Sequence, residues 1–368
     1  MAASAQGDFD TNNSVTNQTI SKRCGDVHRW QEYLVKVWKE DDTFLESISI
    51  RDRFGKSDYV RCFLIIYRLN GFGTKRQGKI GTPTIHRALK NITSHFKNEG
   101  HPDPVRNTGG KLNPKIDKLL KAYRLEDPAP KCHPPLPLTF FKQFLEMKST
   151  PLVEAISQLF CGGLFFGMRS CEYSQPDEEN PRTELLTVDD VKFYDEDGNE
   201  MKSNRKNAAY VKITFRNQKN GKKMESQIRL RSSTIRSYVL CPVRIWASVI
   251  DRILSYDNTS GKTKVNTVIV DGSKTSIRSS TVRLHVKTAV TIIGEDTLKV
   301  KASEIGTHTL RTSFATMLWL KKTDPKEIMI LGRWLSNAFM KYIRRTVILT
   351  AGTDNISNPK NNNIRRLI

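Results

Sequence analysis

The sequence predicts a mainly helical protein in two parts: an all-helical N-terminal domain and a mixed α+β, mainly helical C-terminal domain with a small antiparallel sheet. Three observations lead to this fold class. Apolar residues recur at helical spacing through most of the chain, and helix starts are marked by a capping residue followed by Pro83, Pro114 or Pro325. One stretch alternates like a half-buried strand and runs into an Asn-Gly turn. Five prolines in residues 125–138 predict a stiff connection between the two parts.

The N-terminal part begins with a polar segment. Residues 1–24 are rich in Ala, Ser, Asn, Thr and Gln, and they are expected to be disordered because they bury too little surface to offset ordering. Residues 25–125 are expected to form a bundle of four short helices. Apolar residues at helical spacing indicate these helices in residues 27–37, 57–67, 82–100 and 113–123.

A basic, glycine-rich loop lies between the second and third of these helices. Its cations are Lys75, Arg76 and Lys79. Such a loop is suited to lie along a phosphate backbone, where contacts position a protein without reading sequence. A mobile surface loop is the equally supported alternative.

The C-terminal part follows a Pro-rich linker, residues 126–138, and is expected to span residues 139–347. Helices are predicted at 139–147, 151–164, 242–254 and 279–293, and strands at 183–188, 209–218, 227–231 and 267–270. Asn220-Gly221 predicts a hairpin turn between the second and third strands. Residues 348–368 are expected to be a polar tail.

The net charge of the chain indicates what kind of molecule it binds. The chain holds 60 Lys and Arg against 38 Asp and Glu, which gives a net charge of +22. Nucleic acid is the natural polyanion for such a protein, although ribosomal and membrane-surface proteins are also basic. The cations are spread through the whole chain, which argues against a basic tail on a neutral domain.

The spacing of the cysteines and the length of the apolar runs argue against several classes of protein. The six cysteines form no Cys-x-x-Cys pair, so neither a zinc cluster nor a disulfide framework is indicated, and reduced thiols inside a cell are expected. No apolar run approaches the ~18 residues of a membrane span. The sequence therefore predicts no metal, no small-molecule cofactor and no membrane partner.

The residues with the clearest chemistry lie between 306 and 345. His308 and Arg311 are three residues apart, so they share one face of a helical turn. Two short helices are expected to follow, over 324–332 and after Ser336, and the second carries Tyr342. Thr307 is the expected N-cap of the first helix of this stretch.

An acid–base histidine, a fixed cation and a phenol suit the attack of a tyrosine on a phosphodiester. A phenol has an ordinary pKa near 10 and needs activation by a base or a cation. A guanidinium fork stabilises the charge that develops on the phosphate, and an imidazole can transfer the proton. Each residue also has an ordinary alternative, since the His308–Arg311 spacing arises by chance and a tyrosine on an amphipathic helix is usually core.

These residues resemble the C-terminal boxes of the tyrosine recombinases, which read H-x-x-R, then G-H or G-W, then Tyr. The segment GRWLSNAFMKYIRR, residues 332–345, is especially similar to the recombinases of Crypton-type eukaryotic mobile elements. The resemblance implies that residues 25–125 are a SAM-like, core-binding domain that closes on duplex DNA as a clamp. It also implies that Ile364–Ile368 docks on a neighbouring subunit, with disorder as the alternative.

The resemblance implies further site residues. Arg169, in an R-x-x-E pattern after a buried helix, matches the first catalytic arginine, with Glu172 orienting it; a surface ion pair is the alternative. Lys219, just before the hairpin turn, matches the catalytic lysine. Lys222 and Lys223 are possible substitutes, and each of the three is also suited to a phosphate contact or a solvated turn.

One feature departs from the family pattern. The spacing from Gly332 to Tyr342 is the usual one, but the residue after the glycine is Arg333, and Trp334 comes one position later. The pattern expects His or Trp there. We expect Trp334 to fill this place, with Arg333 as the alternative.

The function implied is cleavage and rejoining of double-stranded DNA through a 3′-phosphotyrosyl link on Tyr342, by a homo-tetramer that joins two DNA sites. DNA as substrate implies a nucleus, or otherwise a bacterial cytoplasm. Three alternatives stay open: a type IB topoisomerase, a domesticated DNA-binding protein without activity, and an RNA-binding protein.

Overall fold

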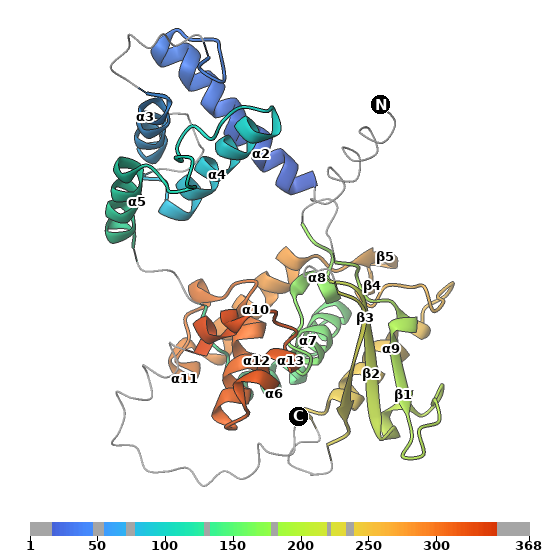
Figure 1. The fold of residues 1–368 in the computed structure, drawn as a ribbon. Helices are drawn as coiled ribbons and strands as arrows, with labels where there is room; N and C mark the ends of the chain where they lie inside the picture. The colour runs from blue at the N-terminus through green and yellow to red at the C-terminus, as the bar shows by residue number, and fades with distance from the viewer. Residues whose placement is uncertain are drawn as a thin grey trace, which may run out of the picture. The chain divides into compact units, whose positions relative to one another are not determined.

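The chain folds as two compact units, residues 1–130 and 131–368, in the computed structural model (Figure 1). The structure describes residues 17–46, 55–70, 78–128, 133–177, 183–218, 222–232 and 239–343. The division between the units falls inside the predicted Pro-rich linker. Each unit has its own hydrophobic core.

The N-terminal unit is helical throughout its described residues. Its elements are α2 (Asn17–Tyr33), the π-helical turn η1 (Leu34–Trp38), α3 (Lys56–Arg68), α4 (Thr82–Asn98) and α5 (Pro114–Glu126). Trp30 of α2 lies at the centre of the core, with its ring centroid 5.6 Å from that of Phe63 and 6.5 Å from that of Phe96. One aromatic cluster therefore joins α2, α3 and α4, and α5 packs Ile116, Leu120 and Tyr123 into the same core.

Two details differ from the sequence prediction. Disorder was expected up to residue 24, whereas α2 begins at Asn17. The helix extends because its buried stripe, which contains Trp30 and the fully buried Asp26, fixes the turns that precede it. The N-cap of α4 is Gly81 rather than Thr82, so Pro83 occupies the second helical position.

The C-terminal unit is built around α7. Its longer helices are α6 (Leu138–Glu146), α7 (Pro151–Leu164), α9 (Pro242–Leu254), α10 (Ser279–Ile293), α12 (Thr309–Leu320) and α13 (Pro325–Leu331). Shorter ones are α8 (Ser170–Tyr173), α11 (Glu295–Leu298), η2 (Val188–Asp190), η3 (Arg205–Asn207), η5 (Ala302–Glu304) and η6 (Asn337–Phe339). The predictions for 139–147, 151–164, 242–254, 279–293 and 324–332 are confirmed to within one residue.

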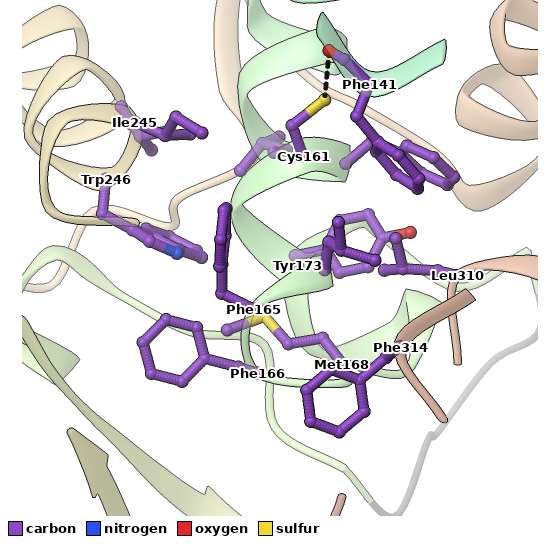
Figure 2. Close-up of a cluster of buried hydrophobic side chains, with 14 of the residues drawn as sticks. Phe141, Cys161, Phe165, Phe166, Met168, Tyr173, Ile245, Trp246, Leu310 and Phe314 are labelled. Carbon is purple, nitrogen blue, oxygen red and sulfur yellow. Dashed lines mark hydrogen bonds between the residues drawn. The ribbon is translucent and has the colours of Figure 1, made fainter. Parts of the chain in front are cut away.

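The C-terminal part of α7 is buried on all sides. Figure 2 shows Phe141 of α6, Ile245 and Trp246 of α9, and Leu310 and Phe314 of α12 around it. A helix buried this way needs small residues where its neighbours approach closely, and a Cβ on Gly162 would lie 3.0 Å from the Trp246 indole nitrogen. That nitrogen donates to the Gly162 carbonyl at 3.1 Å.

An antiparallel three-stranded sheet packs against α9 at one side of this unit (Figure 1). Its strands are β1 (Val191–Tyr194), β2 (Tyr210–Asn217) and β3 (Lys223–Leu230), in the order β1-β2-β3. A second sheet pairs β4 (Thr267–Val270) with β5 (Ser273–Ser276). The predicted strands at 209–218, 227–231 and 267–270 are confirmed, and the turn at Asn220-Gly221 lies outside the described residues.

The strand predicted at 183–188 is wrong. Thr187 begins a capping box instead, because its backbone N–H and its hydroxyl both donate to the Asp190 carboxylate, at 2.8 and 2.9 Å. The chain therefore turns through η2 and forms β1 three residues after the expected strand. Among the described residues, no helix is both long and apolar enough to cross a membrane.

Candidate active site

The turn after α7 brings Arg169 to the surface of the core. Gly167 adopts φ +53°, and a Cβ there would lie 2.6 Å from the Phe314 ring, so both its conformation and its surroundings require glycine. Arg169 caps α8, and its backbone N–H donates to Glu172 Oε2 at 2.9 Å. The Arg169 side chain is 20% exposed, so its guanidinium is open on one side.

Glu172 is a fully buried carboxylate between two arginines. Arg169 Nη1 donates to its Oε1 at 3.1 Å, and Arg333 donates to both oxygens, at 3.0 and 2.7 Å. Burial alone raises the pKa of Glu172, but the two guanidinium groups outweigh it and hold the pKa below its ordinary value. The carboxylate is therefore charged, and it holds the Arg169 side chain by one hydrogen bond.

Arg311 of α12 is the second cation of the site and is 3% exposed. Its guanidinium donates to the carbonyls of Gly167, at 2.6 Å, and Gly332, at 2.8 Å. Burial, and then the charge of Arg169, lowers the pKa of Arg311 to about 9. Carbonyls supply no full negative charge, so this position favours an anion such as a phosphate.

Three rings lie in a row beside Arg311. The Arg311 guanidinium carbon is 4.4 Å from the Trp334 ring centroid, and the Trp334 ring is 6.1 Å from that of Tyr342. The ring of His308 lies on the other side of Tyr342, at 6.3 Å between centroids. The structure thus brings together the cation, the phenol and the imidazole that the sequence singles out.

His308 is positioned by the backbone that leads into α12. It is the N-cap of this helix, in place of the predicted Thr307, because residues 306–309 already form a turn in which the Gly306 N–H donates to Thr309 Oγ1. Ser313 Oγ accepts from the backbone N–H of Leu136 at 2.8 Å. This bond ties the segment before α6 to α12.

Arg333 and Trp334 occupy different places. Arg333 has φ +55° and turns its side chain into the core toward Glu172, whereas Trp334 faces Tyr342 and Arg311. A Cβ on Gly332 would lie 1.7 Å from the Trp334 ring, so the glycine leaves room for the indole. Trp334 is therefore the residue beside the tyrosine, despite its shifted position in the sequence.

The lysines of the β2–β3 hairpin are only partly described. Lys219 lies outside the described residues, while Lys222 and Lys223 are exposed at the start of β3. Of the N-terminal loop cations, Lys75 and Arg76 also lie outside the described residues. Lys79 is exposed and pairs with Glu126 at 3.1 Å, a surface contact that costs little to exchange for another anion.

Two residues beside the site were not predicted. His133 donates through Nδ1 to the Glu304 carbonyl, 2.8 Å away, and its ring lies 6.4 Å from that of His308. Gln218 contacts Arg333. No sequence signal would have found His133, because it lies among the linker prolines, more than 170 residues before its carbonyl partner.

The described residues contain no cluster of three or more His, Cys, Asp and Glu side chains that could hold a metal ion. They do contain two arginines whose charges act on each other, Arg169 and Arg311, with the indole of Trp334 beside Arg311 and the Tyr342 phenol and His308 imidazole next to it. The chemistry that this set can perform is nucleophilic attack on a bound phosphate, with stabilisation of the charge that develops on it.

Comparisons with known proteins place the fold. No family model matches the chain, and a search of curated proteins finds no match. Among solved structures, the chain is similar to the XerH site-specific recombinase bound to a palindromic difH substrate in a post-cleavage complex, with TM-score 0.52 and 15% identity over 91% of this chain and 79% of that one.

Two further structures are similar at lower scores. They are a lambda integrase dimer bound to a COC′ core site (TM-score 0.47, 12% identity, 93% of each chain) and the Tn1549 transposon integrase in complex with transposon right end DNA (TM-score 0.46, 12% identity, 89% of this chain and 99% of that one). The likeness to XerH carries the conclusion: the chain has the fold of the tyrosine recombinases, with a helical N-terminal domain and a small antiparallel sheet.

Proposed function

We propose that the protein cleaves and rejoins double-stranded DNA at specific sites through a covalent phosphotyrosyl intermediate. The observation that carries this proposal is the position of Tyr342, whose ring lies between those of His308 and Trp334, beside the buried cation Arg311. The fold shared with XerH supports the same class of reaction.

Each residue has a role in one balanced step. Arg169 and Arg311 bind the scissile phosphate, and the Tyr342 hydroxyl oxygen forms a bond to phosphorus while the bond from phosphorus to the 5′ oxygen breaks. The 5′ oxygen takes a proton from a hairpin lysine, Lys219 by resemblance, and His308 assists removal of the phenol proton. Trp334 donates its indole N–H to a nonbridging oxygen.

Rejoining reverses this step with the 5′ hydroxyl of a second strand. The phosphate bond energy is kept in the 3′-phosphotyrosyl link, so the reaction consumes no nucleotide. Exchange between two DNA sites calls for a tetramer, and a DNA substrate places the protein in a nucleus or a bacterial cytoplasm. The Crypton-like segment at 332–345 suggests that the DNA sites belong to a mobile element.

The proposal is tested by a covalent trap. The protein is incubated with a pooled library of nicked duplexes, from which the short leaving fragment diffuses away so that rejoining is blocked. We expect a denaturation-resistant protein–DNA adduct with the parent protein and none with Tyr342→Phe. Sequencing of the trapped DNA identifies the preferred site.

Other outcomes point to other functions. Relaxation of an arbitrary supercoiled plasmid would indicate a type IB topoisomerase. DNA binding that is salt-sensitive and unchanged in Tyr342→Phe, without any adduct from the parent protein, would indicate a DNA-binding protein that has lost the reaction.

A further inference from the structure

Arg333 is an unusual residue to find in a core. Its side chain is fully buried, and its guanidinium carbon lies 3.5 Å from the centroid of the Phe215 ring on β2. Its Nη atoms donate to Glu172, to Gln218 Oε1 at 3.3 Å and to the Phe166 carbonyl at 3.4 Å. One side chain thus contacts the turn after α7, the start of α8 and the end of β2.

Stability alone does not explain a buried ion pair of this kind. Removing two charges from water costs several kcal/mol per ion, and well-packed apolar replacements of a buried pair are often neutral or stabilising. The Arg333–Glu172 pair is therefore better explained by what it holds in place. Both ends of the network lead to groups of the proposed reaction.

The first end is Arg169. Glu172 accepts two hydrogen bonds from Arg333 and only one from the Arg169 side chain. Because Arg333 already donates to both oxygens of Glu172, the Glu172 carboxylate orients Arg169 through a single side-chain hydrogen bond. The Arg169 side chain is 20% exposed, so a phosphate can reach its guanidinium from solvent.

The second end is the base of the lysine-bearing hairpin. Gln218 is 3% exposed, and its Nε2 donates to Glu225 Oε2 of β3 at 2.7 Å. Its backbone N–H donates to the Lys222 carbonyl at 3.1 Å. Gln218, which directly precedes Lys219 in the sequence, therefore joins the end of β2 to Lys222 and to Glu225 of β3, and Arg333 holds the Gln218 amide.

We propose that Arg333 is a positioning residue that sets the phosphate-binding Arg169 and the hairpin lysines relative to each other, through Glu172 on one side and Gln218 on the other. The inference rests on the proposed function. The hydrogen bond between Arg333 and Gln218 then governs proton delivery to the leaving oxygen, whereas the pair with Glu172 governs binding of the phosphate.

The test changes the leaving group. A duplex recovered by the covalent trap is synthesised with oxygen or with sulfur at the 5′-bridging position of the scissile phosphate. A thiol is far more acidic than an alcohol, so the sulfur leaves without a proton from the protein. Single-turnover cleavage of both substrates by each variant then separates proton delivery from phosphate binding.

We expect Gln218→Leu to slow cleavage of the oxygen substrate by about 10-fold to 100-fold and to cleave the sulfur substrate within about threefold of the parent protein. Arg333→Met should slow both substrates, because Arg169 loses its orientation as well. Gln218→Leu removes only one amide from the edge of the network, so it keeps the test decisive even where Arg333→Met does not fold.

Arg229→Met is the matched control. Arg229 lies on β3, is 5% exposed, and donates to the Phe165 carbonyl at 2.7 Å; its other hydrogen bonds go to Ile228 and Gln227, not to Glu172 or Gln218. For the Arg229→Met variant, the ratio of the cleavage rate of the sulfur substrate to that of the oxygen substrate should equal the ratio for the parent protein. An unchanged ratio in Gln218→Leu, or an equally changed ratio in Arg229→Met, overturns the inference while leaving the proposed function intact. Absence of a Tyr342-dependent adduct in the parent protein overturns both.

Discussion

Arg169 and Arg205 form a matched pair of arginines in the C-terminal unit. The Arg169 side chain is 20% exposed and pairs with Glu172, while that of Arg205 is 17% exposed and pairs with Asp251 at 2.8 Å. Of these two residues, Arg169 alone belongs to the proposed phosphate site. Arg169→Ala should reduce adduct formation by about 10²-fold to 10³-fold, as expected for loss of one group that stabilises transition-state charge.

DNA affinity should respond much less, because one phosphate contact among many is lost. The measurements are adduct yield in the covalent trap and DNA binding by fluorescence anisotropy, with Arg205→Ala as the control that leaves both near the parent values. An equal loss of cleavage and binding in Arg169→Ala would make it a binding or structural residue.

Helix α7 runs from its N-cap at Thr150 to the candidate active site, because its last turn leads directly into Gly167 and Arg169. The Thr150 hydroxyl accepts a hydrogen bond from the backbone N–H of Val153 at 3.2 Å. Thr150→Ala should lower the free energy of unfolding by about 1 kcal/mol, since a free N–H is left at the first turn. Ser149→Ala, one residue earlier and exposed, should change it by less than about 0.5 kcal/mol.

Denaturant unfolding followed by circular dichroism measures both variants. If Thr150→Ala and Ser149→Ala prove equally stable, the cap contributes nothing and α7 is held by its buried face alone. In either case the chemistry at the far end of the helix should be unchanged, because the variant removes no contact of Gly167 or Arg169.

The helices could be predicted from sequence because their signals are local. A capping residue followed by proline sets the starts of α5, α7 and α13, and the apolar spacing sets their length. Strand β1 was missed because the segment before it, which ends in the Thr187 capping box, has the composition of a strand.

The site could be predicted only in part. His308, Arg311 and Tyr342 lie close together in the sequence, so their pattern was visible. The contact of Glu172 with Arg333 spans 161 residues, and that of His133 with Glu304 spans 171, so neither has a local pattern. The spacing placed Arg333 directly after Gly332, while the resemblance favoured Trp334, and the left-handed turn at Arg333 is what sends the two side chains in different directions.

The charge of the whole chain, +22, predicts how DNA binding depends on salt. Each neutralised phosphate releases counterions, so a protein with about 6–10 phosphate contacts loses about 10³-fold to 10⁵-fold in affinity between 50 and 200 mM salt. We expect a loss of this size, measured by anisotropy on a fixed duplex at constant pH. Tyr342→Phe should show the same slope, because it removes no charge; a slope near zero would mean that the cations do not contact phosphates.

The buried pair of Glu172 and Arg333 also constrains how this sequence can drift. Loss of Glu172 leaves the Arg333 charge without its carboxylate in the core, and loss of Arg333 leaves Glu172 paired only with Arg169; such a change costs up to about 3–5 kcal/mol, a large share of the stability of an ordinary domain. A lineage that abandons the pair must pass through that intermediate or change both positions together. In descendants of a common ancestor, the two residues should therefore be inherited or lost as one character, although 161 positions separate them in the chain.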